Sequence, residues 1–233
     1  MRRMLIVCVF LSLLVVGSAM GTVHWYPSIT NGITPPDTGD WGDALNWQNT
    51  DTNLANRFML PDDPANTNFK AAFPVANEAE CVVTDVRTVG HMVLGDNGLS
   101  DGSASVLRIV SNGVLNTAQN GVWTGIGYNR PALCIVEEGG ILNAQTTTLG
   151  GDHLWVGLNV GAVGTLEING GTVTNGQMLG LGWSGGIGFI NIHNNGTLWT
   201  KQMHGDGNSS VKNGSLINIT YTDTNKVSGK LVY

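Results

Sequence analysis

The sequence predicts an all-β protein whose middle and C-terminal parts form a β-solenoid, a stack of coils built from short strands. Its composition and an internal repeat are the two observations that predict this fold. Glycine accounts for 33 of the 233 residues, about twice the usual fraction, and charged residues for only 12 %, about half the usual share. Abundant Gly, Asn and Thr with few charges disfavours helices and suits short strands joined by tight turns.

The first 21 residues have the features of a secretory signal peptide. Arg2 and Arg3 precede an apolar run over residues 5–16, and small residues follow it. This order is typical of a cleaved leader, and the run is too short for a bilayer span, which needs about 20 apolar residues. We therefore expect a secreted or cell-surface protein with no membrane span after the leader is removed. An uncleaved membrane anchor is the alternative.

Residues 22–74 predict an N-terminal Trp-rich capping segment of irregular loops and short strands. The segment contains Trp25, Trp41 and Trp47, and its turn signals are dense. Such a segment would cover the open end of a stacked repeat, where strand edges are otherwise unpaired. Trp41 and Trp47 are six residues apart and would share one side of an extended strand. A sugar-binding aromatic face is therefore the alternative to packing in the core.

Residues 75–233 are predicted to form the solenoid, because four segments repeat one pattern. Each unit has an apolar residue, any residue, an apolar residue, a turn containing glycine and a further apolar residue. The units begin at Leu107, Leu133, Leu166 and Ile190, with offsets of 26, 33 and 24 residues. A lone unit cannot bury its apolar face, whereas stacked units build a continuous core of aligned Leu, Ile and Val.

Shorter apolar-glycine motifs lie between these units, and we expect them at the corners of the coils. Glycine supplies the positive φ that a sharp corner requires. The motifs are Ile126-Gly127, Val156-Gly157 and Leu181-Gly182.

The repeat resembles that of a known class of exported proteins. Residues 164–174 (GTLEINGGTVT) with residues 179–183 (LGLGW) resemble the repeat unit of autotransporter and PEP-CTERM-associated repeat proteins. Residues 40–47 (DWGDALNW) are similar to the Trp-containing segment that often precedes such repeats, and residues 73–83 to the strand that starts the first coil. The resemblance covers about residues 40–219. It implies a bacterial exported protein, a right-handed parallel β-helix, and a role in surface display or adhesion.

The charge balance disfavours nucleic acid and anionic membranes as partners. The chain has 11 basic and 17 acidic residues, and two of the basic ones lie in the leader. Binding to phosphates needs clustered Lys and Arg. Beyond the leader the chain has two cysteines, Cys81 and Cys134. An exported chain could pair them, or a solenoid could bury each as a small apolar residue, and the sequence leaves both alternatives open.

We find no catalytic motif and therefore expect no enzyme, no cofactor and no metal. Arg108 and Arg130 are the only basic residues between positions 88 and 200, where acids are also sparse. A polysaccharide lyase or glycoside hydrolase on a β-helix is the further alternative. It would need acids converging with one of these arginines or paired with each other. Asp96, Asn97 and Asp101 offer oxygen ligands for Ca²⁺, but an ordinary turn is the interpretation that we favour.

The function predicted first is that of a non-enzymatic structural or adhesion protein, with extracellular polysaccharide or cell-surface components as partners. The alternative is a carbohydrate-binding module, in which Trp41, Trp47, Trp123 and Trp155 stack on sugar rings. Trp123, Trp155, Trp183 and Trp199 would form a ladder that faces either the core or the ligand. An outward row of Trp would favour carbohydrate binding, whereas an outer surface of Asn and Thr would favour the structural role.

Overall fold

The computed structural model describes a little over half of the chain. The described residues are 22–25, 38–49, 60–61, 70–73, 80–96, 104–117, 123–145, 153–203, 216–219, 221–222, 227–228 and 230–232. The predicted leader, residues 1–21, lies outside them. No helix in these ranges is both long and apolar enough to cross a membrane.

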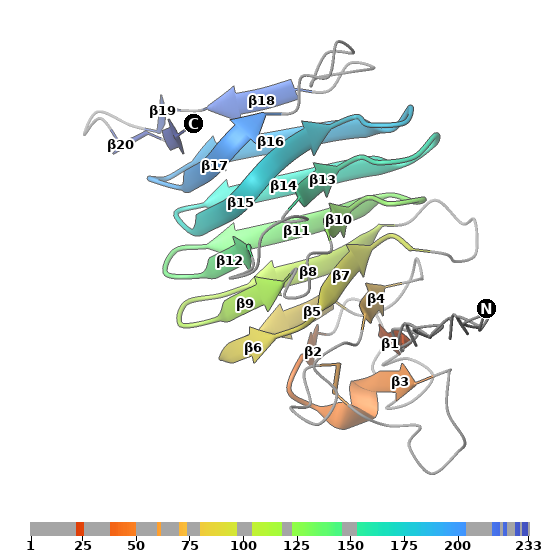
Figure 1. Cartoon of the computed structure of the whole chain (residues 1–233). Coiled ribbons are helices and arrows are strands. Elements are labelled where there is room, and N and C mark those ends of the chain that lie inside the picture. Colours follow the sequence, from red (N-terminus) through yellow and green to blue (C-terminus); the bar gives the residue numbers. More distant parts are fainter. Residues whose placement is uncertain are drawn as a thin grey trace, which may run out of the picture.

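The described part of the chain is all-β, as the composition predicts, and most of its strands belong to two large sheets (Figure 1). Apart from one turn of 3-10 helix, η1 (Ala44–Asn46), these ranges contain no helix. The seven-stranded sheet contains, in spatial order, β18 (Leu216–Ile219), β16 (Ile187–His193), β14 (Val163–Asn169), β11 (Ala132–Glu137), β8 (Ser105–Ile109), β5 (Glu80–Val83) and β2 (Thr38–Asp40).

The twelve-stranded sheet curls, and its strands are parallel except where β1 meets β3. It contains β3 (Trp47–Asn49), β1 (Thr22–Trp25), β4 (Lys70–Phe73), β7 (His91–Leu94), β10 (Thr124–Ile126), β13 (His153–Val156), β15 (Thr172–Leu181), β12 (Ile141–Ala144), β9 (Val114–Thr117) and β6 (Val86–Thr88), with β17 (Thr197–Met203) beside β15 and β21 (Lys230–Val232) beside β17. Strands β19 (Tyr221–Thr222) and β20 (Val227–Ser228) form a separate antiparallel pair.

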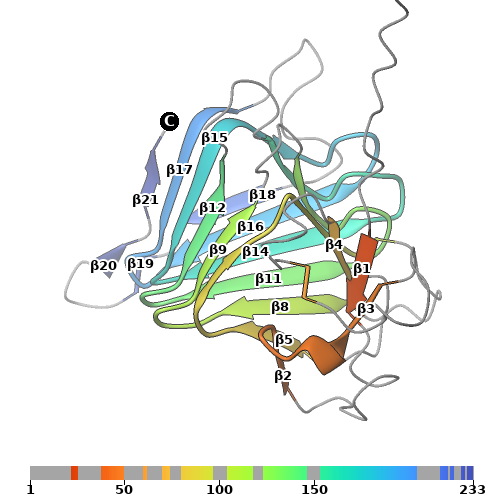
Figure 2. The same ribbon diagram turned by 60° about the horizontal axis from the view of Figure 1, so that its bottom comes forward.

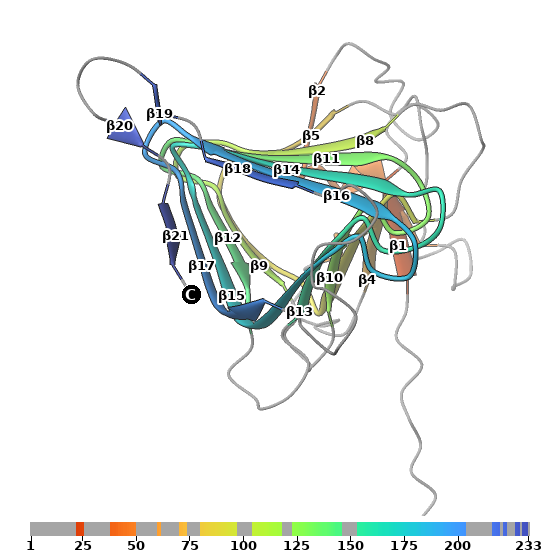
Figure 3. The same ribbon diagram turned by 90° about the horizontal axis from the view of Figure 1, so that it is seen from above.

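The curled sheet has two arms, which join in β15. Residues 172–175 of β15 pair with β12, and residues 178–181 pair with β13. We call β6, β9, β12, β17 and the first half of β15 the β12 arm, and β4, β7, β10, β13 and the second half of β15 the β13 arm. Figures 2 and 3 show the seven-stranded sheet as one side of the molecule and the two arms as the other two.

The chain passes through these three sides in repeated circuits. Strands β8, β9 and β10 follow one another along the chain, and each pairs in parallel with its counterpart β11, β12 or β13 in the next circuit. The inward side chains therefore align from circuit to circuit. One such ladder in the seven-stranded sheet contains Cys81, Leu107, Cys134, Leu166 and Ile190, all fully buried. Burial of each large apolar member stabilises the stack by roughly 1.5–3 kcal/mol.

This register corrects one of the four predicted repeat units. Leu107 pairs with Cys134, not with Leu133. Strand β11 is apolar at both alternating sets of positions, so its sequence does not mark the inward face. A shift of one residue exchanges the two faces of a strand. Leu133 and Ile135 therefore lie on the outer face, whereas Cys134 and Val136 are buried.

The same ladder decides between the two alternatives for the cysteines. Cys81 and Cys134 lie two strands apart, with Leu107 between them. Two strand spacings amount to about 9.6 Å, whereas bridged cysteines have Cα atoms no more than about 7 Å apart. Both cysteines are accordingly free and buried. Burial raises the pKa of the Cys134 thiol to about 12, so it stays protonated.

The predicted corner glycines are confirmed. Leu94, Ile126, Val156 and Leu181 align, and the glycine after each has a φ between 64° and 72°. At Gly157 a Cβ atom would lie 2.0 Å from the carbonyl oxygen of Ile187 in the next circuit. Glycine is therefore needed there for the backbone angle and also for the close approach of two circuits.

The tryptophans of the predicted capping segment pack at the N-terminal end of the stack. Trp25, Trp41, Trp47 and Phe73 are each at most 2 % exposed, and the indole rings of Trp41 and Trp47 lie 4.7 Å apart. The Nε1 atom of Trp47 donates a hydrogen bond to the carbonyl oxygen of Trp41 (2.9 Å). The interpretation of Trp41 and Trp47 as ligand-stacking residues is therefore wrong, because their rings are covered on both faces.

Candidate functional site

The outer face of the β12 arm carries a straight row of aligned side chains. Thr88, Asn116, Asn143, Thr174 and Trp199 occupy the same position in β6, β9, β12, β15 and β17. Consecutive residues of a strand point to opposite faces. In β9, β12, β15 and β17, the residue that precedes the aligned one is fully buried; these residues are Leu115, Leu142, Val173 and Leu198. We call the five outward residues the Asn/Thr row.

Hydrogen bonds connect the polar members of the Asn/Thr row across the strands. Thr174 Oγ1 donates to Asn143 Oδ1 (2.6 Å), and Asn143 Nδ2 donates to Asn116 Oδ1 (2.8 Å). Asn116 Nδ2 in turn donates to Thr88 Oγ1 (3.1 Å). These bonds hold each side chain in one orientation, so the row is a preorganised line of amides and hydroxyls.

Trp199 is the last member of the Asn/Thr row, next to Val232 of β21, with which it is in register. It is the most exposed tryptophan among the described residues, at 40 %. It pairs with Thr174 in register, so its indole ring continues the line of polar side chains. The described side chains of the β12 arm include no aspartate or glutamate. The face therefore offers hydrogen-bonding groups, one aromatic ring and the ammonium group of the exposed Lys201.

The outer face of the β13 arm gathers aromatic side chains in two groups. In the first, Trp123 lies 4.5 Å from His91 and 5.1 Å from Tyr128 between ring centroids. His91 is only 7 % exposed, and its two ring nitrogens have no hydrogen-bond partner. Burial, reinforced by the nearby Lys70 ammonium, lowers the pKa of His91 to about 4.

In the second group, Trp155 packs between strand β15 and Trp183. A Cβ atom at Gly180 would lie 2.1 Å from the ring of Trp155, and the rings of Trp155 and Trp183 are 5.1 Å apart. Trp155 is consequently only 8 % exposed. Trp155 thus faces outward from its strand, as a Trp ladder that faces a ligand would require. Most of its surface is nevertheless covered by the protein.

The carboxylate of Asp96, one of the oxygen groups considered for Ca²⁺, forms an ion pair. Its Oδ2 atom lies 2.5 Å from the Nζ atom of Lys70, and the residue is 4 % exposed. Asn97 and Asp101, the other two residues considered for Ca²⁺, lie outside the described residues. In the part of the chain that the structure describes, no three His, Cys, Asp or Glu side chains are placed to hold a metal ion.

Two acids flank Arg108 on the outer face of the seven-stranded sheet. Acids that converge on this arginine are a feature that a polysaccharide lyase or glycoside hydrolase would need. The Nε atom of Arg108 lies 2.6 Å from Glu80 Oε1, and its Nη1 atom lies 2.5 Å from Glu137 Oε1. Both carboxylates are therefore engaged by one guanidinium. Arg130, the other candidate, lies in an exposed bend.

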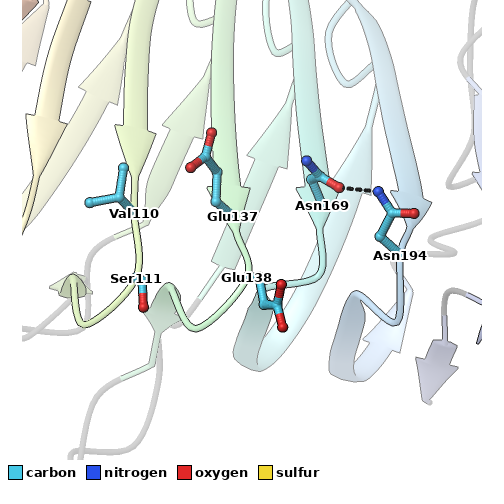
Figure 4. A pocket seen from close by; sticks show the side chains of 6 residues that line it. All are labelled: Val110, Ser111, Glu137, Glu138, Asn169 and Asn194. Atoms are coloured by element: carbon cyan, nitrogen blue, oxygen red, sulfur yellow. Dashed lines mark hydrogen bonds between the residues drawn. The ribbon is translucent and has the colours of Figure 1, made fainter.

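A shallow hollow lies at the corner beyond Glu137, where strands of the seven-stranded sheet end (Figure 4). Its volume is about 510 Å³, and no basic side chain lines it. In Figure 4 the carboxylates of Glu137 and Glu138 point in different directions. The lining residues are Val110, Ser111, Glu137, Glu138, Asn169 and Asn194.

No family model, curated protein or solved structure matches the chain. The resemblance to autotransporter and PEP-CTERM-associated repeats consequently rests on the quoted repeat segments alone.

Sequence reasoning missed the Asn/Thr row, although the sequence contains its signal. The glycine at the first turn of each unit is followed three residues later by a member of the row. The four pairs are Gly113 and Asn116, Gly140 and Asn143, Gly171 and Thr174, and Gly196 and Trp199. The sequence predicts Trp199 only as a member of a Trp ladder, because its alignment with Thr174 depends on the register between strands.

Proposed function

We propose that the protein is a right-handed parallel β-helix that acts outside the cell as a non-enzymatic structural and adhesion module. The circuits of parallel strands support the β-helix, and connections between parallel strands are right-handed in about 98 % of cases. The leader-like order of residues 1–21 supports export.

The observation that carries this proposal is the bonding of outward amides from circuit to circuit. Besides the Asn/Thr row, Asn159 Nδ2 donates to Asn129 Oδ1 (2.7 Å), and Asn194 Nδ2 donates to Asn169 Oδ1 (2.5 Å). Such ladders make the outer surface rigid and repeat the same chemical groups along the stack. A surface of this kind suits attachment through several equivalent contacts, in which each weak contact raises the effective concentration of the next.

The pairing of the outward acids favours a non-enzymatic role over a polysaccharide lyase or glycoside hydrolase. A hydrolase needs two carboxylates on either side of the bond that is cleaved. Glu80 and Glu137 both bind Arg108, and Glu167 Oε1 accepts a hydrogen bond from Asn191 (2.5 Å). These carboxylates are occupied by neighbouring side chains that hold the sheet together.

Cosedimentation with intact bacterial cells tests the adhesive function. The purified protein is mixed with washed cells of several species, and an acidic protein of similar mass serves as the control. We expect a saturable fraction of the protein, and not of the control, to pellet with at least one cell type. Failure to pellet with any cell type would refute the adhesive role.

A further inference from the structure

We propose that the Asn/Thr row binds a neutral, extended polysaccharide, which lies across the strands along the stacking direction. One sugar ring stacks on Trp199, and the following units hydrogen-bond to Thr174, Asn143 and Asn116. This inference names the target of the adhesive function proposed above and rests on that function.

The spacing of the Asn/Thr row suits a chain of repeating units. Neighbouring strands lie about 4.8 Å apart, so the four steps from Thr88 to Trp199 span about 19 Å. Each step presents one polar or aromatic side chain on the same line. A polymer whose units advance by a similar distance can therefore contact each strand in the same way.

The hydrogen-bonding groups of the Asn/Thr row retain capacity for a ligand. An amide has two N–H donors and an oxygen with two lone pairs. Asn143 uses one donor toward Asn116 and one lone pair toward Thr174, which leaves one of each. The hydroxyl of Thr174 donates to Asn143 and can still accept. Sugar hydroxyls both donate and accept, so they match the groups that remain.

Trp199 provides the apolar contact that a sugar ring requires. Its indole is 40 % exposed on a sheet face. The C–H face of a pyranose ring can cover such an indole and remove apolar area from water. Trp199 lies in register with Thr174. When one sugar ring stacks on Trp199, the next sugar unit of the chain therefore lies beside the hydroxyl of Thr174.

The charges of the protein favour a neutral polymer over an acidic one. The chain carries a formal charge of −6, which repels an acidic polysaccharide. Arg87, the cation nearest to the start of the row, is held by Asp85, with Nε 2.5 Å from Oδ1. The row itself contains no charged residue, although the exposed Lys201 lies two residues beyond Trp199 on the same face of β17. Recognition along the row therefore comes from stacking and from neutral hydrogen bonds.

Depletion by insoluble neutral polysaccharides tests the site. The natural protein, Trp199→Ala, Trp199→Tyr and Val160→Ala are incubated with cellulose, β-1,3-glucan, mannan and xylan. Val160 is 80 % exposed in a turn outside the row, so Val160→Ala is a matched truncation of an exposed apolar side chain. We expect Trp199→Ala to weaken binding to at least one polymer by about tenfold. Trp199→Tyr should bind within about threefold of the natural protein, and Val160→Ala should bind equally well, because both keep an aromatic ring at the row.

Parallel binding to cells separates this proposal from the adhesive function. Cells are pretreated with periodate, which oxidises sugars, or with a protease, and the same four proteins are compared. Loss of binding after periodate and in Trp199→Ala supports the polysaccharide site. Binding that Trp199→Ala leaves unchanged, or that only the protease removes, overturns the site while the adhesive function stands. Absence of binding to untreated cells overturns both.

Discussion

Gly157 shows at the scale of one residue why this stack depends on glycine. It has a φ of 72°, and a Cβ atom there would meet the Ile187 carbonyl oxygen at 2.0 Å. Gly161 has a φ of 82°, but a Cβ atom there would meet nothing within 4 Å. The two glycines therefore share the backbone requirement and differ in the close contact between circuits.

We predict that Gly157→Ala destabilises the protein far more than Gly161→Ala. Gly161→Ala should lower the free energy of unfolding by about 1–2 kcal/mol, the cost of a positive φ at a residue with a Cβ atom. Gly157→Ala adds a clash with main-chain atoms that cannot move without separating two circuits, so its cost should exceed about 4 kcal/mol. Urea unfolding followed by circular dichroism measures both. Equal losses would show that the circuits do not approach each other at Gly157.

A second prediction at this scale concerns His91 and pH. Its pKa is about 4 in the folded protein, chiefly through burial, against 6.5 for the free side chain. Lys70 also lowers this pKa, and Asp96 raises it. The unfolded chain therefore binds the proton first, and the folded state loses stability as the pH falls from about 6.5 toward 4.

Between pH 7 and pH 5 this linkage should remove about 2 kcal/mol from the free energy of unfolding. His91→Phe, which cannot titrate, should lose correspondingly less over the same interval. Urea midpoints at the two pH values make the comparison. A loss of equal size in both proteins would mean that other groups cause the pH dependence.

At the scale of the element, β11 provides the sharpest test of the strand register. Ile135 lies on the outer face, whereas Val136 is fully buried. We predict that Val136→Thr costs about 2 kcal/mol, because it buries a hydroxyl without a partner, and that Ile135→Thr costs less than about 1 kcal/mol. Both replacements keep a β-branched residue, so strand propensity hardly changes. The opposite order of costs would restore the register in which Leu133 aligns with Leu107.

The same strand shows how far the sequence could predict the fold. Three of the four repeat units and the corner glycines follow from the sequence, because their inward and outward residues differ in polarity. Strand β11 does not, because both of its faces are apolar. Other features join residues that lie apart in the chain. These are the packing of Trp41 on Trp47, the Asn/Thr row, and the contacts of Arg108 with Glu80 and Glu137. Local patterns cannot specify such contacts before the register is known.

At the scale of the whole molecule, the three outer faces of the stack carry different kinds of side chain. The β12 arm presents the Asn/Thr row, the β13 arm presents packed aromatic rings, and the seven-stranded sheet presents ion pairs around Arg108. Since the inner side chains only need to be apolar and to align, each outer face can change without disturbing the core. We propose that these faces attach the protein to a surface.

The most direct test of this account records binding and cleavage in the same tubes. The purified protein is incubated with a panel of bacterial, algal and plant polysaccharides, and both the protein left in solution and the new reducing ends are measured. We predict depletion of the protein by at least one polymer, with no increase in reducing ends over a sample without protein. Reducing ends that increase in proportion to the amount of protein would contradict the account and would identify the protein as an enzyme.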